Sequence, residues 1–171
     1  MNADELRQLQ APLKARYKED PKSGVVTLRA VGRVEQASVT CVLETGKPGI
    51  AVGLHPAAGG DGSWACSGDM LLEALVGCAG VTLAAVATAM GIELRRARVS
   101  AEGELDFRGT LGVARDAAVG FTNIHCVFEI DTPAPAEKVQ KLVELSERYC
   151  VIFQTLSRPP TLEVRTLTSS G

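Results

Sequence analysis

The chain of 171 residues is long enough for one domain with a buried core, and 46% hydrophobic with 22% charged residues is an ordinary globular balance. A net charge of −2 argues against binding to nucleic acid or to an anionic membrane, and an aromatic content of 4% argues against a base-stacking platform. The five cysteines include no Cys-x-x-Cys pair, and the first residues lack signal-peptide character. We therefore expect a cytoplasmic protein whose thiols stay reduced unless they are catalytic.

The first third of the chain predicts a helix, two strands and a long loop. Residues 3–18 carry leucines at helical spacing, and we treat residues 1–20 as an N-terminal helical extension. Residues 25–32 and 38–44 have the composition of paired strands. Residues 46–67 are rich in glycine and predict a flexible loop.

The longest apolar run, residues 69–90, predicts a central helix. No charged residue lies between Ala74 and Gly91, so the run meets the length criterion for a membrane span. Many of its residues are Ala, Gly or Thr, which contribute little transfer free energy, and we favour a buried helix. A helix that is apolar on every side must be covered all round, which in so short a chain favours a second subunit.

The second half of the chain predicts two long strands, a helix and a closing strand. Apolar and polar residues alternate through residues 96–107 and 121–130, as in half-buried antiparallel strands. Residues 136–149 show the helical period, and residues 162–167 predict the closing strand. No second domain boundary is visible, so we expect residues 1–171 to form one α+β domain with curved antiparallel sheets around two central helices.

Two cysteines lie on the predicted helices. Cys78 is in the middle of the central helix, and Cys150 is at the end of the next one. Each alone fits the usual fate of a free cysteine, a small buried apolar side chain, but two thiols on packed helices can also form a redox pair. Cys41 and Cys126 fit core positions, and Cys66 is either inert or a spare resolving thiol.

The segments around both thiols resemble two motifs of the OsmC/Ohr family. Residues 68–78, GDMLLEALVGC, are similar to a helix motif in which an acidic residue, a leucine pair and a small-residue stretch lead to a cysteine. Residues 149–156, YCVIFQTL, are similar to a second motif, Cys-Pro-Val followed by a polar residue and Thr-Leu, although Val151 replaces the proline. The resemblance covers roughly residues 25–167.

This resemblance implies an intertwined homodimer and a thiol-dependent peroxidase that acts on organic hydroperoxides in an antioxidant stress response. Cys78 is then the peroxidatic thiolate, and Cys150 resolves its sulfenic acid as a Cys78–Cys150 disulfide. No metal or cofactor is implied, and the thiol reductant stays open. The alternative is a non-enzymatic dimer that binds a small hydrophobic ligand in an apolar pocket.

The remaining candidate residues surround this thiol. A thiolate in an apolar site needs a cation or a hydrogen-bond donor, and the Gly-Arg pair ending at Arg33 resembles the family's arginine element; a solvated turn arginine is the alternative. Asp69 is either the acid that orients this arginine or the N-cap of the central helix. His55, Leu75 and Phe153 are candidates for substrate contacts, although a loop histidine is more often merely solvated.

Overall fold

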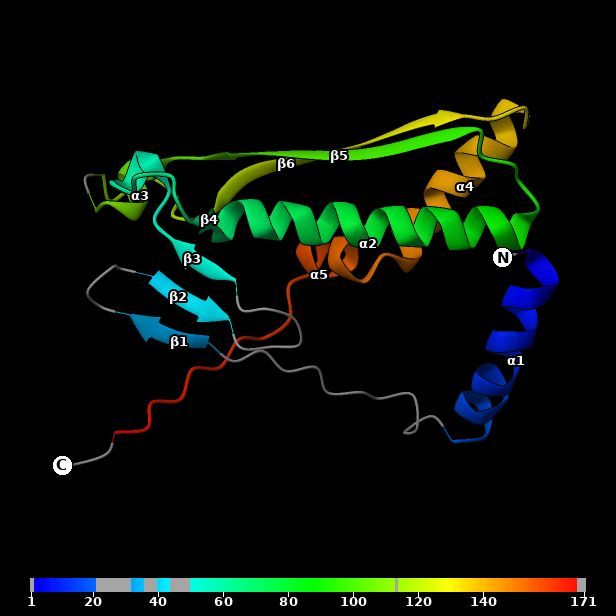
Figure 1. Cartoon of the computed structure of the whole chain (residues 1–171), viewed down its shortest axis with the longest axis horizontal. Coiled ribbons are helices and arrows are strands. Elements are labelled where there is room, and N and C mark those ends of the chain that lie inside the picture. Colours follow the sequence, from blue (N-terminus) through cyan, green and yellow to red (C-terminus); the bar gives the residue numbers. More distant parts are fainter. Residues whose placement is uncertain (1, 21–31, 36–39, 44–49, 113, 169–171) are drawn as a thin grey trace.

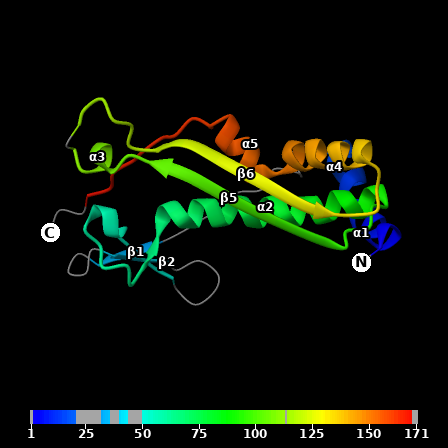
Figure 2. The same cartoon turned by 90° about the horizontal axis from the view of Figure 1, so that it is seen from above.

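The computed structural model describes residues 2–20, 32–35, 40–43, 50–112 and 114–168. Its axis is the long helix α2 (Ser67–Met90), which carries strands β5 (Arg96–Leu105) and β6 (Phe121–Asp131) on one side (Figure 1). Viewed from above, β5 and β6 run obliquely across α2, and two further helices lie along its flank (Figure 2). This mixture of helices and antiparallel strands agrees with the predicted α+β class.

Residues at both ends of helix α2 favour its observed boundaries. Asp69 lies in the first turn, where a negative charge favours the helix dipole. The helix stops at Gly91, whose φ of 64° is in the left-handed region and whose N–H donates to the carbonyls of Ala87 and Thr88. The helix start at Ser67 makes Cys66 the N-cap residue, so the interpretation of Asp69 as N-cap is wrong.

The N-terminal part contributes helix α1 (Ala3–Glu19), as predicted, and a small sheet of order β1-β2-β3-β4. Strands β1 (Gly32–Glu35) and β2 (Thr40–Leu43) pair antiparallel. β2 lies within the predicted strand 38–44, whereas β1 overlaps the predicted strand 25–32 only at Gly32. Residues 25–31, 38, 39 and 44 of the two predicted strands lie outside the described residues.

The predicted loop over residues 46–67 is wrong in part, because it contains two short strands. β3 (Ala51–Gly53) pairs antiparallel with β2 and parallel with β4 (Ala65–Cys66). A short 3₁₀ turn, Pro56–Ala58, lies between them. Strands of three and two residues are too short to show a period of two, so their glycine-rich surroundings dominate the sequence pattern.

The strands β5 and β6 form an antiparallel pair that runs from Arg96 opposite Asp131 to Leu105 opposite Phe121. The register shifts once, at Glu104 and Leu105. Both strands agree with the predicted alternation, and their apolar face packs on α2. The four-residue helix α3 (Phe107–Thr110) between them has no counterpart in the prediction.

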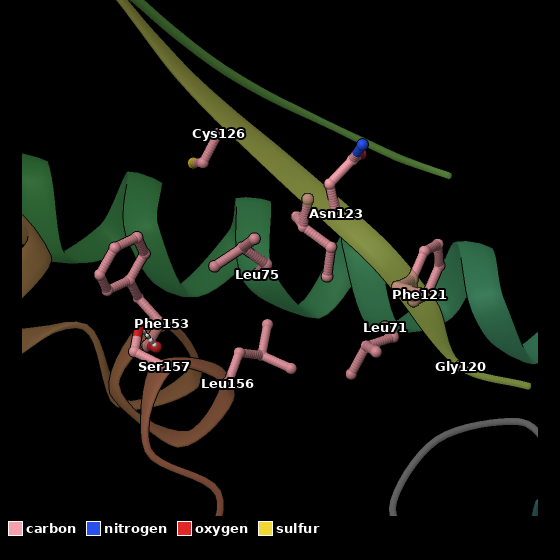
Figure 3. Close-up of a pocket in the computed structure, with 10 residues that line it drawn as sticks. Leu71, Leu75, Gly120, Phe121, Asn123, Cys126, Phe153, Leu156 and Ser157 are labelled. Atoms are coloured by element: carbon pink, nitrogen blue, oxygen red, sulfur yellow. Dashed lines mark hydrogen bonds between the residues drawn. The ribbon is translucent and has the colours of Figure 1, made fainter. Parts of the chain in front are cut away.

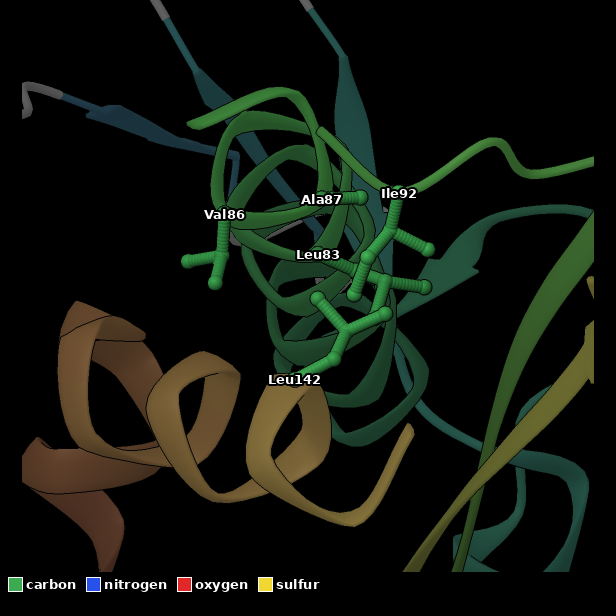
Figure 4. Packing of buried hydrophobic residues seen from close by; sticks show 5 residues of the cluster. All are labelled: Leu83, Val86, Ala87, Ile92 and Leu142. Carbon is green, nitrogen blue, oxygen red and sulfur yellow. The ribbon is translucent and has the colours of Figure 1, made fainter. Parts of the chain in front are cut away.

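The core consists of two clusters along α2. One joins α2 to helix α4 (Ala136–Tyr149), whose bounds match the prediction, and its most buried member is Leu142 at 0% exposure (Figure 4). The members of this first cluster are Leu83, Val86, Ala87, Ile92 and Leu142. The second cluster holds Leu75, Ala79 and Cys150.

The C-terminal part differs from the prediction in two ways. A separate helix, α5 (Val151–Ser157), follows α4 after a break at Cys150, whose ψ of 110° is extended. The predicted strand at residues 162–167 is wrong for the single chain, since no strand follows Ser157 among the described residues. A strand needs a hydrogen-bonded neighbour, and here Leu162, Val164 and Leu167 are 86%, 93% and 98% exposed.

One side of α2 is left uncovered by the residues that the structure describes. Ala74, Gly77, Val81 and Ala84 are exposed, Val81 by 73%, and we call these four residues the open face of α2. By length and composition alone, α2 is the one helix among the described residues that could cross a membrane, a test that the core helices of soluble proteins also pass. The prediction of a helix covered on all sides therefore needs cover from outside the described chain.

Candidate active site

The structure brings Cys78 and Cys150 together. Cys78 lies on α2, and Cys150, which is 1% exposed, lies at the junction of α4 and α5, both of which pack against α2. The two side chains share a cluster with Leu75 and Ala79, and the thiol of Cys150 is hydrogen-bonded to the sulfur of Cys78. Both cysteines are free thiols. The structure therefore brings the two thiols into contact.

Cys150 also organises the backbone at the junction. Its N–H donates to the carbonyl of Ser146 at 3.0 Å, which closes α4, and its carbonyl accepts from the N–H of Gln154 at 3.0 Å. Its Sγ accepts from the N–H of Phe153 at 3.4 Å and so caps α5. One residue thus ends one helix and begins the next, and this break aims the first turn of α5 at Cys78.

The surroundings of Cys78 favour its thiolate. Burial raises the pKa of the Cys78 thiol, but hydrogen bonds from the N–H of Ile152, the thiol of Cys150, the N–H of Val151 and the hydroxyl of Thr82 together hold that pKa below its ordinary value. The Thr82 hydroxyl is one helical turn along α2 and also donates to the Cys78 carbonyl at 2.8 Å. Neutral donors at a helix N-terminus are a recognised way to activate a cysteine.

The pKa of the Cys150 thiol is shifted in the opposite direction, above its ordinary value. Burial raises its pKa most, and the neighbouring Cys78 raises it further, against the lowering effect of the N–H groups of Phe153 and Ile152. Of the two thiols, Cys78 is therefore the one that ionises first, and Cys150 keeps its proton and donates it in a hydrogen bond. The two thiols are therefore not equivalent: Cys78 is the nucleophile, and Cys150 is its protonated partner.

An apolar cavity of about 540 Å³ lies beside the pair, between α2, β6 and α5 (Figure 3). Leu75 and Phe153 belong both to its wall and to the cluster around the two thiols, whereas Cys78 itself does not line it. Other lining residues include Leu71, Ile124, Cys126 and Leu156. The predicted contacts of Leu75 and Phe153 with a substrate fit this position.

Cys126 lines the same cavity but is not activated. Burial raises the pKa of the Cys126 thiol, and the nearby carboxylate of Glu147 raises it further. A thiol held in its protonated form is a poor nucleophile. Cys126 therefore contributes a small apolar wall, in keeping with its predicted core position.

His55 and Asp69 lie elsewhere, in a cavity of about 350 Å³ at the start of α2 that Cys66 also lines. The imidazole of His55 accepts from the N–H of Ala57 at 3.0 Å through Nδ1 and stacks on Phe107 with ring centroids 4.9 Å apart. Nine residues of helix separate Asp69 from Cys78, which is about 13 Å along the axis. These two candidates are not brought to the thiol pair.

The position of Arg33 is known only through its backbone. It lies in β1 opposite Val42, and its side chain is outside what the structure describes. Its role as a cation for Cys78 stays a prediction. Among the described residues, no three His, Cys, Asp or Glu side chains are grouped to hold a metal ion.

Sequence reasoning missed the donors that the structure places around Cys78. Thr82 follows Cys78 by four residues, a spacing that puts both on one helical face, so its contribution could have been found. Val151 occupies the position where the family motif has proline, which has no N–H, and this substitution was the signal for an added donor. The N–H of Ile152 has no sequence signature.

Comparison with solved structures identifies the fold as OsmC-like. An OsmC-like protein from Mycoplasma pneumoniae matches with a TM-score of 0.65 and 16% identity over 78% of this chain and 89% of that one. The organic hydroperoxide resistance protein OhrB of Bacillus subtilis matches with a TM-score of 0.53 and 18% identity over 78% and 92%. A Legionella pneumophila protein described as an organic hydroperoxide resistance protein OsmC matches with a TM-score of 0.58 and 12% identity over 78% and 93%.

The amino-acid sequence also shows to which family the chain belongs. The family profile described as OsmC-like protein matches residues 60–165, which include both cysteines and most of the described core. The chain therefore belongs to the OsmC family. A comparison with curated proteins finds no match.

Proposed function

We propose that the protein is a thiol peroxidase that reduces organic hydroperoxides through Cys78 and Cys150. The observation that carries the proposal is the asymmetry of the pair, in which hydrogen bonding lowers the pKa of Cys78 while burial and Cys78 raise that of Cys150. Membership of the OsmC family, and structural neighbours named for organic hydroperoxide resistance, support the same activity.

The reaction begins at the Cys78 sulfur. The thiolate attacks the terminal oxygen of the hydroperoxide, the O–O bond breaks, and the alkoxide leaves and takes a proton to become an alcohol. Cys78 is then a sulfenic acid. The Cys150 thiol loses its proton and attacks that sulfur, hydroxide leaves and is protonated to water, and a Cys78–Cys150 disulfide forms. The peroxide gains two electrons, and a thiol reductant returns two to the disulfide.

The cavity beside the pair supports an organic substrate. Its walls are mainly hydrocarbon, and a chain or ring that enters it is removed from water near the thiols. Hydrogen peroxide gains nothing from such a cavity. Leu75 and Phe153 belong both to the cavity wall and to the cluster around the two thiols, which supports their contact with the apolar part of the substrate.

The working form in our proposal is a homodimer in the cytoplasm, where thiol reductants can recycle the disulfide. The open face of α2 supports it, because a small-residue stripe lets a second helix approach closely and bury Val81. Cys78 lies one residue from Gly77 and so borders this face. A partner subunit seated there shields the thiolate from water and can supply a cation, with Arg33 as the candidate.

Three single variants test the activity. Cys78→Ser should abolish consumption of cumene hydroperoxide, because the hydroxyl is not ionised near neutral pH. Without added reductant, Cys150→Ser should consume about one equivalent and leave Cys78 as a sulfenic or higher acid, seen by mass spectrometry of the cysteine peptide. Cys66→Ser, which lies outside the 540 Å³ cavity, is the matched control and should keep full turnover. Undiminished turnover by Cys78→Ser contradicts the proposal.

The second candidate function, a non-enzymatic binder, is favoured by one observation: the cavity is not lined by Cys78. Thiol titration separates the two. If the free thiols of the wild-type protein are unchanged by hydroperoxide while an apolar dye binds the cavity, the binder replaces the peroxidase.

A further inference from the structure

The first turn of α5 is capped by sulfur. The N–H groups of Val151 and Ile152 are hydrogen-bonded to the Cys78 sulfur, and the N–H of Phe153 donates to Cys150 Sγ at 3.4 Å. The first N–H groups of any helix lack partners within the helix and depend on a cap. Here that cap is the redox pair itself, so its chemical state and the stability of α5 are connected.

Apart from this cap, helix α5 is held by the partly buried side chains of Ile152, Phe153 and Leu156, which pack on the cluster around Cys150. It has seven residues, and none of them is buried. A helix this short is marginal without its cap and its packing contacts. Three of its residues, Phe153, Leu156 and Ser157, form one wall of the 540 Å³ cavity. Whatever loosens α5 therefore loosens that wall.

Oxidation of the pair changes both sulfurs as hydrogen-bond acceptors. When the disulfide forms, the Cys78 thiolate and the Cys150 thiol together lose two electrons and one proton, and Cys78 loses its negative charge. The charge-assisted bonds from Val151 and Ile152 are the strong ones in this set, and they depend on that charge. The sulfurs of a disulfide are neutral and weak acceptors, so the first-turn N–H groups of α5 are left without adequate partners.

We propose that the Cys78–Cys150 disulfide releases α5 and opens the cavity that α5 closes in the dithiol form. This switch deepens the proposed function and rests on it for its physiological oxidant, because the peroxide both oxidises the pair and enters the cavity. The reduced protein holds the apolar part of the substrate, and the oxidised protein lets the apolar alcohol leave before the pair is reduced again.

Amide hydrogen exchange measures whether α5 is released in the disulfide form. The protein is compared as the dithiol and after treatment with diamide, an azo compound whose N=N bond accepts the two electrons and one proton of the pair and a second proton from water. Peptide mapping verifies the Cys78–Cys150 disulfide. The amides of residues 151–156 should exchange at least about fivefold faster in the disulfide form, the ratio expected from losing a helix cap. The amides in the first turns of α4 should not change.

Two variants of one residue provide matched controls. Cys150→Ser keeps an oxygen cap for Phe153 N–H but cannot form the disulfide, so its α5 exchange should stay slow and not respond to diamide. Cys150→Ala removes the acceptor of Phe153 N–H in every state, and its α5 should exchange faster than that of the wild-type dithiol without oxidant. The amides of α4 report whether either variant still folds.

The outcomes separate the switch from the peroxidase. If a verified disulfide leaves exchange in α5 unchanged, or if diamide forms no Cys78–Cys150 disulfide, the switch is overturned. If diamide forms the disulfide and loosens α5 while hydroperoxides oxidise neither cysteine, the switch stands and the peroxidase falls.

Discussion

At the scale of single residues, Val151 affects Cys78 through one backbone N–H. That N–H is among the groups that lower the pKa of the Cys78 thiol. Proline is tolerated at the first position of a helix, which Val151 occupies, and it removes the N–H with little disturbance of the fold. Val151→Pro should therefore raise the pKa of Cys78.

The measurement is the rate of Cys78 alkylation by iodoacetamide as a function of pH. In Val151→Pro the rate should rise at higher pH than in the wild type, with slower alkylation at pH 7 as the result. Val151→Ala keeps the N–H and should follow the wild-type profile. A Val151→Pro profile that coincides with that of Val151→Ala contradicts the role of this N–H.

The two thiols contribute to stability in opposite pH ranges. The folded pKa of Cys78 is below that of the unfolded chain, so its contribution is fully present above the unfolded pKa and is lost as pH falls through the folded pKa. The folded pKa of Cys150 is raised, so its contribution is present below the unfolded pKa and is lost as pH rises through the folded pKa.

The sequence indicated the two thiols through their motifs. It did not indicate the difference between their pKa values, because backbone donors leave no sequence pattern.

At the scale of elements, the helices and strands that were predicted well are long. α4, β5 and β6 each carry at least ten residues of a clear period, and α2 is recognisable from the length of its apolar run. α5 was missed because the apolar stripe of α4 continues through Cys150 to Phe153, and only the backbone angles at Cys150 reveal the break. That break determines the site, since it turns the first-turn N–H groups of α5 toward Cys78.

The open face of α2 makes a prediction at this scale. Val81→Asp places a charge where we propose a second subunit, and burying an unpaired carboxylate is strongly unfavourable. The dimer dissociation constant should rise at least about tenfold, an effect of about 1.4 kcal/mol. Analytical ultracentrifugation over a range of concentrations measures it.

The control is Val127→Asp, because Val127 is 50% exposed on β6, away from α2. It should leave the association unchanged. Equal association of Val81→Asp and the wild type argues that α2 is covered by something other than a second copy of the chain.

At the scale of the whole molecule, the C-terminal segment explains why one predicted strand is missing. Residues 162–167 alternate as a strand does, and among the described residues no strand pairs with them. A pattern in the sequence reports which residues are to be buried, but not which chain buries them. The patterns of this segment and of α2 predict burial that the described residues do not provide, and the second copy that we propose would supply it.

Amide exchange tests this expectation. The amides of residues 162–167 should be protected at concentrations where the protein is a dimer, and should exchange at nearly the free-peptide rate after dilution to monomer. Residues 124–130 of β6, which pair with β5 in the single chain, are the internal control and should stay protected in both. Fast exchange of 162–167 in a verified dimer contradicts strand pairing by this segment.

Helix α2, with 24 residues and a length of about 36 Å, also has a consequence for newly made chains. If the dimer that we propose forms, a copy leaving the ribosome presents the open face until a second copy binds, and the waiting time grows as copies become scarce. During that interval any other apolar surface would compete with the second copy for the same stripe. The yield of folded dimer should then rise with the rate of synthesis.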